Sequence, residues 1–346
     1  MPDPTEKYIR TFLEHYKNGD INEAKNCVIN LTKEYPNCSF GWKALGAILK
    51  QEGTIKESLE YTKKSIELSP GDAEAYNNLG VTYKDLGLLH KACESYHKAI
   101  KLKPGYAEAY SNLGSSLRSL GRLEEAEVCC KKAVELKPSL GSAQSNLAAT
   151  LLELGKVEES DMSCRATIAI KPDYAEAWSN LLLLNASMRF EVSRYRADAR
   201  DFSDMISRQV NSPFKRWFCD KHPEKLRIGF VSGDFKAHPV GFFLEGLLSQ
   251  LKLSGLELFA YPTNSPMGEV TNRLKDLFHS WTPLLGLSDK DAAHSIHNDS
   301  IHILVDLSGH TAKNRLPIFG WKPAPIQISW LGYFASTGLP EIDYIL

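Results

Sequence analysis

Residues 76–104 read YNNLGVTYKDLGLLHKACESYHKAIKLKP, and this stretch decides the fold of the first half of the chain. In its first part, aromatic and leucine residues recur three or four positions apart, which places them on one face of a helix that ends at Gly87. A second helix is expected over 89–102, and Pro104 ends it because proline lacks an amide donor and disfavours helix in the residue before it. The stretch therefore predicts a pair of helices joined by a short turn.

The same pattern recurs every 34 residues. Prolines keep this step at Pro36, Pro70, Pro104, Pro138 and Pro172. Glycines keep it at Gly19, Gly53, Gly87, Gly121 and Gly155, and leucines at Leu45, Leu79, Leu113, Leu147 and Leu181. One period kept by several residue types resembles the tetratricopeptide repeat, in which each helical pair buries part of its apolar face against the next pair. We expect four full repeats over 42–175, a less regular one over 8–40 and a closing helix near 176–188.

Four asparagines occupy the same place in successive repeats, just before the repeated leucine. They are Asn78, Asn112, Asn146 and Asn180. In one interpretation this polar position simply faces solvent. In the other, the amides form a ladder along the concave surface of the array, where each can donate to and accept from an extended peptide backbone. The second interpretation predicts peptide binding with little dependence on the peptide's sequence.

The 34-residue period stops near residue 188, and the composition changes. Residues 189–225 are rich in charged residues, contain one expected helix over 193–209, and are interpreted as a helical connector. From residue 226, short apolar stretches alternate with amphipathic helical stretches. This alternation is typical of a doubly wound parallel sheet, so an α/β domain over 226–346 is predicted to follow the all-α domain of residues 1–188.

Polar stretches follow three of the expected strands. They are SGDFKAHP at 232–239, DLSGHT at 306–311 and LGYFASTG at 331–338. Ligands of doubly wound sheets bind beyond the carboxyl ends of the strands, so these stretches are predicted to share one rim. A histidine after a strand is more often a turn or packing residue than a catalyst. His238 is nevertheless a candidate for proton transfer or hydrogen bonding to a ligand, because imidazole changes its charge near neutral pH.

Other residues near this rim favour structural interpretations. His310 is interpreted as a solvated loop histidine, and Asp234 as a cap of the following turn or helix. Three glycines are interpreted as turn residues, because no G-x-G-x-x-G pattern follows the first strand. They are Gly309, Gly332 and Gly338.

Three histidines close together in the sequence raise the question of a metal site. They are His294, His297 and His302. Their spacing divides them between an expected helix and an expected strand, and no cysteine lies nearby, so no metal is expected.

The composition is that of an ordinary globular protein. Hydrophobic residues make up 43% and charged residues 24% of the 346 residues, and the formal net charge is −1. This balance gives no reason to expect binding to nucleic acid or to an anionic membrane. The seven cysteines form no C-x-x-C pair and most lie in helical patterns, which favours reduced thiols. No apolar run approaches the ~20 residues of a membrane helix, and we expect a cytoplasmic protein.

The stretches LRIGFVSGDFKAHPVGFF at 226–243 and PAPIQISWLGYFASTG at 323–338, together with the repeats, resemble the O-linked N-acetylglucosamine transferase family in its bacterial form. The resemblance implies a tetratricopeptide superhelix joined to two Rossmann-like halves in the GT-B arrangement, with residues 226–346 as the amino-terminal half. It implies an inverting transfer of N-acetylglucosamine from UDP-GlcNAc to serine or threonine hydroxyls of proteins, without a metal or other cofactor. Acceptor proteins would bind through the repeat groove, where the family has an asparagine ladder at this position.

The same resemblance implies roles for five residues of the rim. His238 matches an active-site histidine near the donor, and Pro239 matches the contact residue beside it. Leu331 and Gly332 match a Leu-Gly pair that lines the sugar pocket. Arg315 matches a basic residue near the acceptor and the donor phosphates.

Two positions depart from the family. Val240 stands where animal members have threonine, so a hydroxyl contact is absent there. Gln209 aligns with a second histidine that is proposed as a base in the family. Glutamine cannot take a proton in this pH range, so either the alignment slips at this point or that role is lost.

The chain ends at EIDYIL, on an expected apolar strand where the family continues into its second Rossmann-like half. The resemblance therefore implies a fragment that is weakly active or inactive as a transferase alone. The alternative interpretation is a non-catalytic tetratricopeptide scaffold that binds peptides and carries a degenerate glycosyltransferase half-domain.

Overall fold

The computed structural model describes residues 4–187, 192–220, 222–251, 255–264 and 268–346. The chain forms two compact units, Met1–Lys156 and Val157–Leu346. The first unit is helical, and the second joins helices to a parallel sheet. In the described ranges, no helix is both long and apolar enough to cross a membrane.

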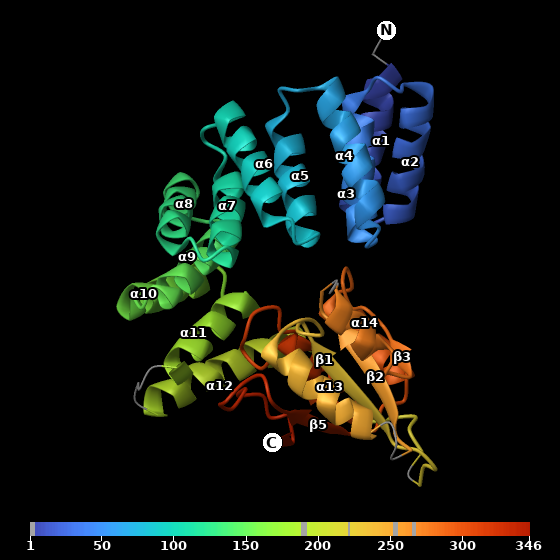
Figure 1. Ribbon diagram of the computed structural model, residues 1–346, viewed down its shortest axis with the longest axis vertical. Helices are drawn as coiled ribbons and strands as arrows, with labels where there is room; N and C mark the ends of the chain where they lie inside the picture. Colours follow the sequence, from blue (N-terminus) through green and yellow to red (C-terminus); the bar gives the residue numbers. More distant parts are fainter. Residues whose placement is uncertain (1–3, 188–191, 221, 252–254, 265–267) are drawn as a thin grey trace. The chain divides into compact units, whose positions relative to one another are not determined.

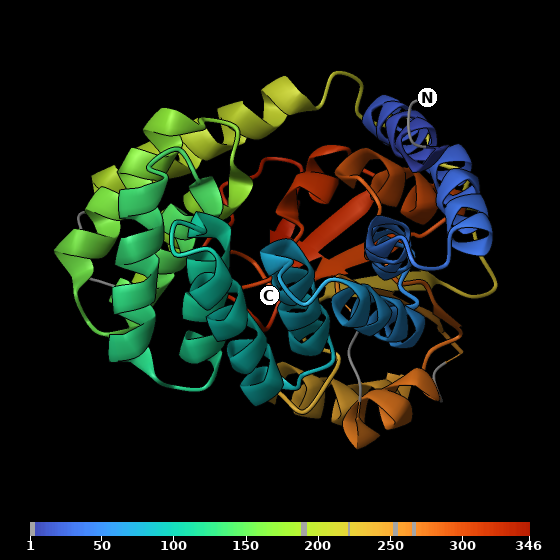
Figure 2. The same ribbon diagram turned by 90° about the horizontal axis from the view of Figure 1, so that it is seen from above.

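The first unit is a row of helices, each packed against the next (Figure 1 and Figure 2). Its helices are α1 (Pro4–Asn18), α2 (Ile21–Glu34), α3 (Ser39–Gln51), α4 (Ile55–Leu68), α5 (Ala73–Asp85), α6 (Leu89–Leu102), α7 (Ala107–Ser119), α8 (Leu123–Leu136) and α9 (Gly141–Glu153). The two helices expected within 76–104 are confirmed as α5 and α6, and α6 has the predicted bounds. The tetratricopeptide pattern of the sequence is therefore present as paired helices with short turns.

The repeated glycines make the turns between paired helices. Gly87 has a φ of 74°, which residues with a β-carbon adopt rarely, and the other four repeated glycines have values from 74° to 84°. Gly80 has a different role, because a β-carbon added to it would lie 2.5 Å from the ring of Tyr96. Tyr96 is fully buried between the helices. Gly80, inside α5, thus permits the close approach of α5 and α6 that the sequence pattern suggests.

The second unit begins with three helices. They are α10 (Val157–Ile170), α11 (Ala175–Ser187) and α12 (Val192–Gln209). α11 is the expected closing helix and α12 the helix expected in the connector, and Arg165 of α10 donates to both carboxylate oxygens of Asp198 in α12, at 2.9 and 3.2 Å. Compact packing thus divides the chain at residue 156, whereas the sequence period continues through α11. The division by packing and the division by sequence period differ because α10 and α11 carry the repeat pattern but pack within the second unit.

In the described residues the sheet has six parallel strands in the order β3-β2-β1-β4-β5-β6. The strands are β1 (Arg227–Ser232), β2 (Glu257–Pro262), β3 (Ser280–Trp281), β4 (Ile303–Asp306), β5 (Ile326–Ser329) and β6 (Tyr344–Ile345). The connecting helices are α13 (Pro239–Leu251), α14 (Glu269–Lys275), α15 (Asp289–Asn298) and α16 (Leu316–Gly320). Figure 2 shows α13 and α14 on one face of the sheet and α15 and α16 on the other. This is the doubly wound arrangement that the sequence predicts.

Apolar side chains on both faces hold the sheet beneath its rim. Phe230 of β1 and Leu258 of β2 pack with Leu244 of α13 on one face. On the other face α12 packs on α16, where a β-carbon added to Gly320 would lie 2.5 Å from Ile206. The chain connects β1 to β2 and β4 to β5, in opposite directions across the sheet. The adjacent strands β1 and β4 therefore form the switch point at which doubly wound sheets bind ligands.

Candidate functional site at the switch point of the sheet

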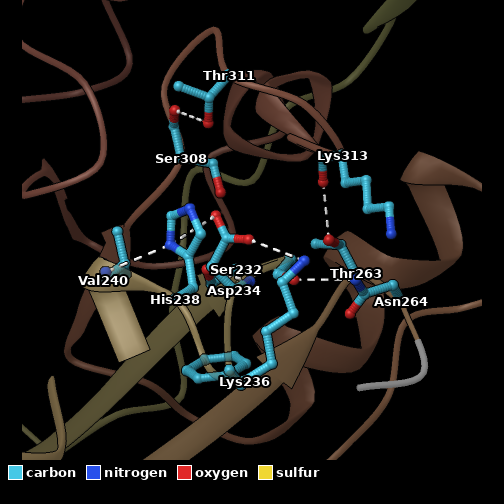
Figure 3. Close-up of polar contacts among 12 residues, drawn as sticks. Ser232, Asp234, Lys236, His238, Val240, Thr263, Asn264, Ser308, Thr311 and Lys313 are labelled. Carbon is cyan, nitrogen blue, oxygen red and sulfur yellow. Dashed lines mark hydrogen bonds and ion pairs between the residues drawn. The ribbon is translucent and has the colours of Figure 1, made fainter. Parts of the chain in front are cut away.

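The candidate site lies at the carboxyl ends of β1 and β4 (Figure 3). Ser232 ends β1, Asp234 and His238 follow it, and Ser308 follows β4. Because β1, β4 and β5 are adjacent and parallel, the polar loops after them meet at one edge, as the sequence predicts. Figure 3 shows the Ser308 hydroxyl and the His238 ring pointing toward Asp234. The rim therefore gathers a carboxylate, an imidazole and a hydroxyl.

His238 stands just before α13 and is 40% exposed at its side chain. Its Nδ1 accepts a hydrogen bond from the Val240 amide at 3.3 Å. In the neutral ring the proton then lies on Nε2, which makes Nε2 a donor that a ligand could accept from. Pro239 begins the helix, a position where the missing amide donor of proline costs nothing.

The Asp234 carboxylate has a different role from the capping role expected of it. Its Oδ1 lies 3.4 Å from Lys236 Nζ, and its Oδ2 lies 3.7 Å from His238 Nδ1. The chain turns back at this point before α13 starts, with the Lys236 amide donating to the Asp234 carbonyl at 2.7 Å. The turn leaves the carboxylate beside the histidine instead of at the helix end, so it belongs to the polar cluster of the rim.

The loop after β4 is organised by Asp306, which sequence reasoning missed. Asp306 is 1% exposed and accepts hydrogen bonds from the amides of Ser308 at 3.0 Å and Gly309 at 2.8 Å. Burial raises the pKa of its carboxyl to about 6. The signal available in the sequence is the order Asp-Leu-Ser-Gly, because an aspartate often bonds the backbone two residues later in a turn.

The loop after β5 places Leu331 and Gly332 on the rim. Leu331 has a φ of 71° and packs at the edge of the core beneath the site. The expectation that three glycines serve turns holds for Gly309 and Gly338, whose φ values are 53° and 77°. Gly332 serves a close approach instead, because a β-carbon added there would lie 1.8 Å from the Leu307 carbonyl oxygen.

His310 is not the solvated loop histidine that the sequence suggests. Its side chain is 1% exposed, and its Nε2 lies 2.9 Å from the Thr337 carbonyl. Burial lowers the pKa of the ring to about 4. The solvated interpretation fails because helices distant in the sequence cover this loop: Phe202 of α12 meets the ring edge-on at 5.0 Å.

Arg315, at the start of α16, is bound to protein partners. Its Nε donates to Asp289 Oδ1 at 2.7 Å, and its two terminal nitrogens donate to the carbonyls of Leu284 and Leu287 at 3.3 and 3.1 Å. These partners hold the guanidinium at the start of α15, and a role toward donor phosphates stays a prediction. Gln209 is exposed at the end of α12 and donates to the Asp173 carbonyl at 3.0 Å.

The four repeated asparagines are half-buried, and Asn112 and Asn146 each bond the preceding repeat. Asn112 donates to Asn77 Oδ1 at 3.0 Å, and Asn146 donates to Ser111 Oγ at 3.0 Å. This contact belongs to neither interpretation drawn from the sequence. Each amide carries a second hydrogen and a carbonyl oxygen, so a peptide-binding ladder of Asn78, Asn112, Asn146 and Asn180 stays a prediction.

The histidines that raised the question of a metal site have structural partners. The ring nitrogens of His294, His297 and His302 lie within hydrogen-bonding distance of the carbonyls of Lys290, Arg216 and Asp220. Among the residues that the structure describes, no group of three or more His, Cys, Asp or Glu side chains could hold a metal ion. All seven cysteines are unpaired, and four of them are buried.

The sequence of this chain is similar to those of several known proteins. The UDP-N-acetylglucosamine–peptide N-acetylglucosaminyltransferase of Caenorhabditis elegans is 35% identical over 133 residues, 37% of this chain and 11% of the relative. A probable enzyme of the same description, SPINDLY of Solanum lycopersicum, is 35% identical over 136 residues, 38% of this chain and 15% of the relative. The matches therefore span less than a sixth of these curated relatives.

A solved structure is similar to this chain over a larger part of its length. A mutant of the Thermobaculum terrenum O-GlcNAc transferase superimposes with a TM-score of 0.73 at 28% identity, covering 79% of this chain and 53% of that one. Two tetratricopeptide repeat models match residues 73–106 and 107–140, and the model described as glycosyl transferase family 41 matches residues 179–346. That last match starts in α11 and takes in the whole rim around His238. Residues 179–346 accordingly match glycosyl transferase family 41, and tetratricopeptide repeats precede them in the chain.

Proposed function

We propose that this chain supplies the repeat array and the first Rossmann-like half of a peptide N-acetylglucosaminyltransferase. The reaction moves N-acetylglucosamine from UDP-GlcNAc to a serine or threonine hydroxyl of an acceptor protein. The observation that carries the proposal is the position of His238, Leu331 and Gly332 at the switch point of a family 41 sheet. A ligand bound there lies beyond the carboxyl ends of β1, β4 and β5.

The proposed chemistry is a displacement with inversion at the anomeric carbon. The acceptor oxygen forms a bond to that carbon, the bond from the carbon to the UDP oxygen breaks, and UDP leaves with the electron pair. The acceptor hydroxyl gives up its proton to solvent water in the same process. The arrangement of His238, with Nδ1 accepting from the Val240 amide, supports Nε2–H as a hydrogen-bond donor to the donor sugar or its phosphate. We propose no metal or other cofactor for this step.

The repeats would bring acceptor proteins to this rim. We propose that Asn78, Asn112, Asn146 and Asn180 bind an extended acceptor backbone through the amide atoms that the inter-repeat bonds leave over. The bond from Asn112 supports this, because one hydrogen of that amide suffices for the link to Asn77. Asn146 Nδ2 donates to both the hydroxyl and the carbonyl of Ser111, so its carbonyl oxygen is the atom proposed to bind the backbone. The seven unpaired cysteines support a reducing compartment, and we place the protein in the cytoplasm.

The test is a calorimetric titration of the 346-residue chain with UDP-GlcNAc, beside the variant His238→Ala. Micromolar binding that is weakened about tenfold or more in the variant supports the donor site. Mass spectrometry of a serine- and threonine-containing peptide, incubated with the chain and UDP-GlcNAc, then tests transfer. The absence of binding at millimolar UDP-GlcNAc would instead favour a non-catalytic, peptide-binding scaffold.

A further inference from the structure

His310 connects α11, the last helix of the repeat register, to the rim of the sheet. Its ring is buried against Phe202 of α12 and meets the Tyr333 ring edge-on at 5.3 Å. Its Nδ1 lies 3.1 Å from Ser179 Oγ in α11, and its Nε2 lies 2.9 Å from the carbonyl of Thr337. The imidazole therefore touches the repeat register through one nitrogen and the rim loop through the other.

The chemistry of these partners determines the direction of each hydrogen bond. A carbonyl has no hydrogen to give, so His310 Nε2 must donate to Thr337, and the neutral ring must accept at Nδ1. The Ser179 hydroxyl therefore donates to Nδ1, while its oxygen accepts from Asn314 Nδ2 at 3.2 Å. Burial lowers the pKa of the ring, so the neutral form prevails near pH 7. One directed chain of hydrogen bonds thus runs from Asn314 through Ser179 and His310 to Thr337.

Thr337 lies in the rim loop, residues 330–339, which also carries Leu331 and Gly332. The two helices that contact His310, α11 and α12, also form hydrogen bonds to other residues of this loop. The Tyr333 hydroxyl donates to the Leu182 carbonyl of α11 at 3.3 Å. The Tyr195 hydroxyl of α12 bonds the Ser336 carbonyl and lies 3.2 Å from the Tyr333 hydroxyl. The loop is therefore anchored to α11 and α12 on both sides of Phe334.

We propose that Ser179 and His310 are positioning residues for donor binding, because they fix the rim loop from the last helix of the repeat register. Neither side chain touches the ligand; both act through Thr337 on the loop that presents Leu331 and Gly332. The proposal rests on the proposed function for the identity of the ligand. The family 41 match begins at Ser179, so it includes most of α11 together with the sheet domain.

The first test measures the loop without any ligand. Amide hydrogen exchange at pH 7 is compared between the full chain and the variant Ser179→Ala, which removes the donor to His310 Nδ1. Amides of residues 330–339 are expected to exchange about threefold to tenfold faster in the variant, the change that loss of one buried hydrogen bond produces. Ser187→Ala is the matched control on the same helix, since its hydroxyl donates to the Leu183 carbonyl within α11. Equal exchange in Ser179→Ala and Ser187→Ala would overturn the proposal.

A second pair of variants separates the loss of a hydrogen bond from a general loss of packing around His310. His310→Gln keeps an amide N–H that can donate to Thr337, whereas His310→Leu fills similar space without any donor. Slow exchange of the rim loop in the glutamine variant and fast exchange in the leucine variant support the hydrogen-bonded role. Equal exchange in the two variants would show that His310 acts by its volume alone.

The last measurement links the loop to the ligand. Calorimetry with UDP-GlcNAc is expected to show a dissociation constant about threefold to tenfold higher for Ser179→Ala than for Ser187→Ala. An unchanged constant would overturn the role in donor binding. If the unmodified chain binds no UDP-GlcNAc, the proposed function fails, and the exchange data still decide whether Ser179 and His310 position the loop.

Discussion

Gly332 lies so close to Leu307 that a β-carbon added to the glycine would sit 1.8 Å from the Leu307 carbonyl oxygen. Leu307 follows β4 and Gly332 follows β5, so main-chain atoms of two rim loops are in direct contact. A side-chain rotation cannot relieve a clash at this point, because the obstructing atom belongs to the backbone. The rim that carries Leu331 therefore depends on the absence of a side chain at residue 332.

Gly332→Ala is expected to lower the free energy of unfolding by about 2–3 kcal/mol, the usual cost of forcing an extra carbon into a packed site. Urea denaturation measures this change. Gly246→Ala is the matched control, because a β-carbon added to that residue of α13 would meet no atom of another segment within 4 Å. Alanine there is expected to raise the free energy of unfolding by about 0.5–1 kcal/mol. Equal effects of the two substitutions would contradict the close contact.

The buried ring of His310 should make stability depend on pH. The pKa is about 4 in the folded chain and 6.5 in the reference state, so the unfolded chain binds the extra proton between these values. The stabilisation is complete above about pH 6.5 and is lost as the pH falls toward 4. The free energy of unfolding, measured by urea denaturation, should fall by up to about 3 kcal/mol more in the natural chain than in His310→Gln.

The comparison with His310→Gln removes the contribution of Asp306. The pKa of that carboxyl is raised to about 6, so its effect on stability has the opposite sign over nearly the same pH range. Both proteins contain Asp306, and its contribution cancels in the difference between them. A difference that stays constant from pH 7 to pH 4 would show that His310 is not held neutral.

The division of the chain at residue 156 predicts which fragments fold. A fragment of residues 157–346 keeps α10 and α11 and is expected to unfold cooperatively on heating. A fragment of residues 192–346 loses the partners of His310 and Tyr333 in α11, Ser179 and the Leu182 carbonyl, and is expected to lack a cooperative transition. Circular dichroism and calorimetry of both fragments measure the outcome. Equal cooperativity would show that α11 is dispensable to the sheet domain.

The asparagine row predicts two separable effects. Asn146→Ala removes the bonds from Asn146 to Ser111 and should lower the free energy of unfolding by about 1 kcal/mol. Asn78→Ala should have a smaller effect, since its side chain makes no such inter-repeat bond in the described residues. If the amides also bind acceptor backbones, fluorescence anisotropy should show that both variants bind an extended peptide more weakly. Weaker peptide binding confined to Asn146→Ala would favour a purely structural role.

Local patterns in the sequence were sufficient for the helices and for the order of the domains. The bounds of α6, the turn at Gly87 and the alternation that gives β1, β2, β4 and β5 each depend on neighbours within a few residues. Such preferences act within a helical turn or along a strand, so they are visible in a single chain. The meeting of the loops after β1, β4 and β5 followed as well, because parallel strands place their carboxyl ends at one edge.

The sequence by itself therefore determined the repeats, the doubly wound sheet and the rim on which His238 stands. Tertiary structure alone decided which rim residues are buried and what they bond. His310 lies 131 residues from Ser179 in the chain, and nothing local to the SGHT stretch shows that α11 and α12 will cover it. The same holds for Gly332, whose neighbour Leu307 lies in the loop after another strand. Burial and hydrogen bonding depend on which distant segments pack together, and that packing is a property of the folded chain as a whole.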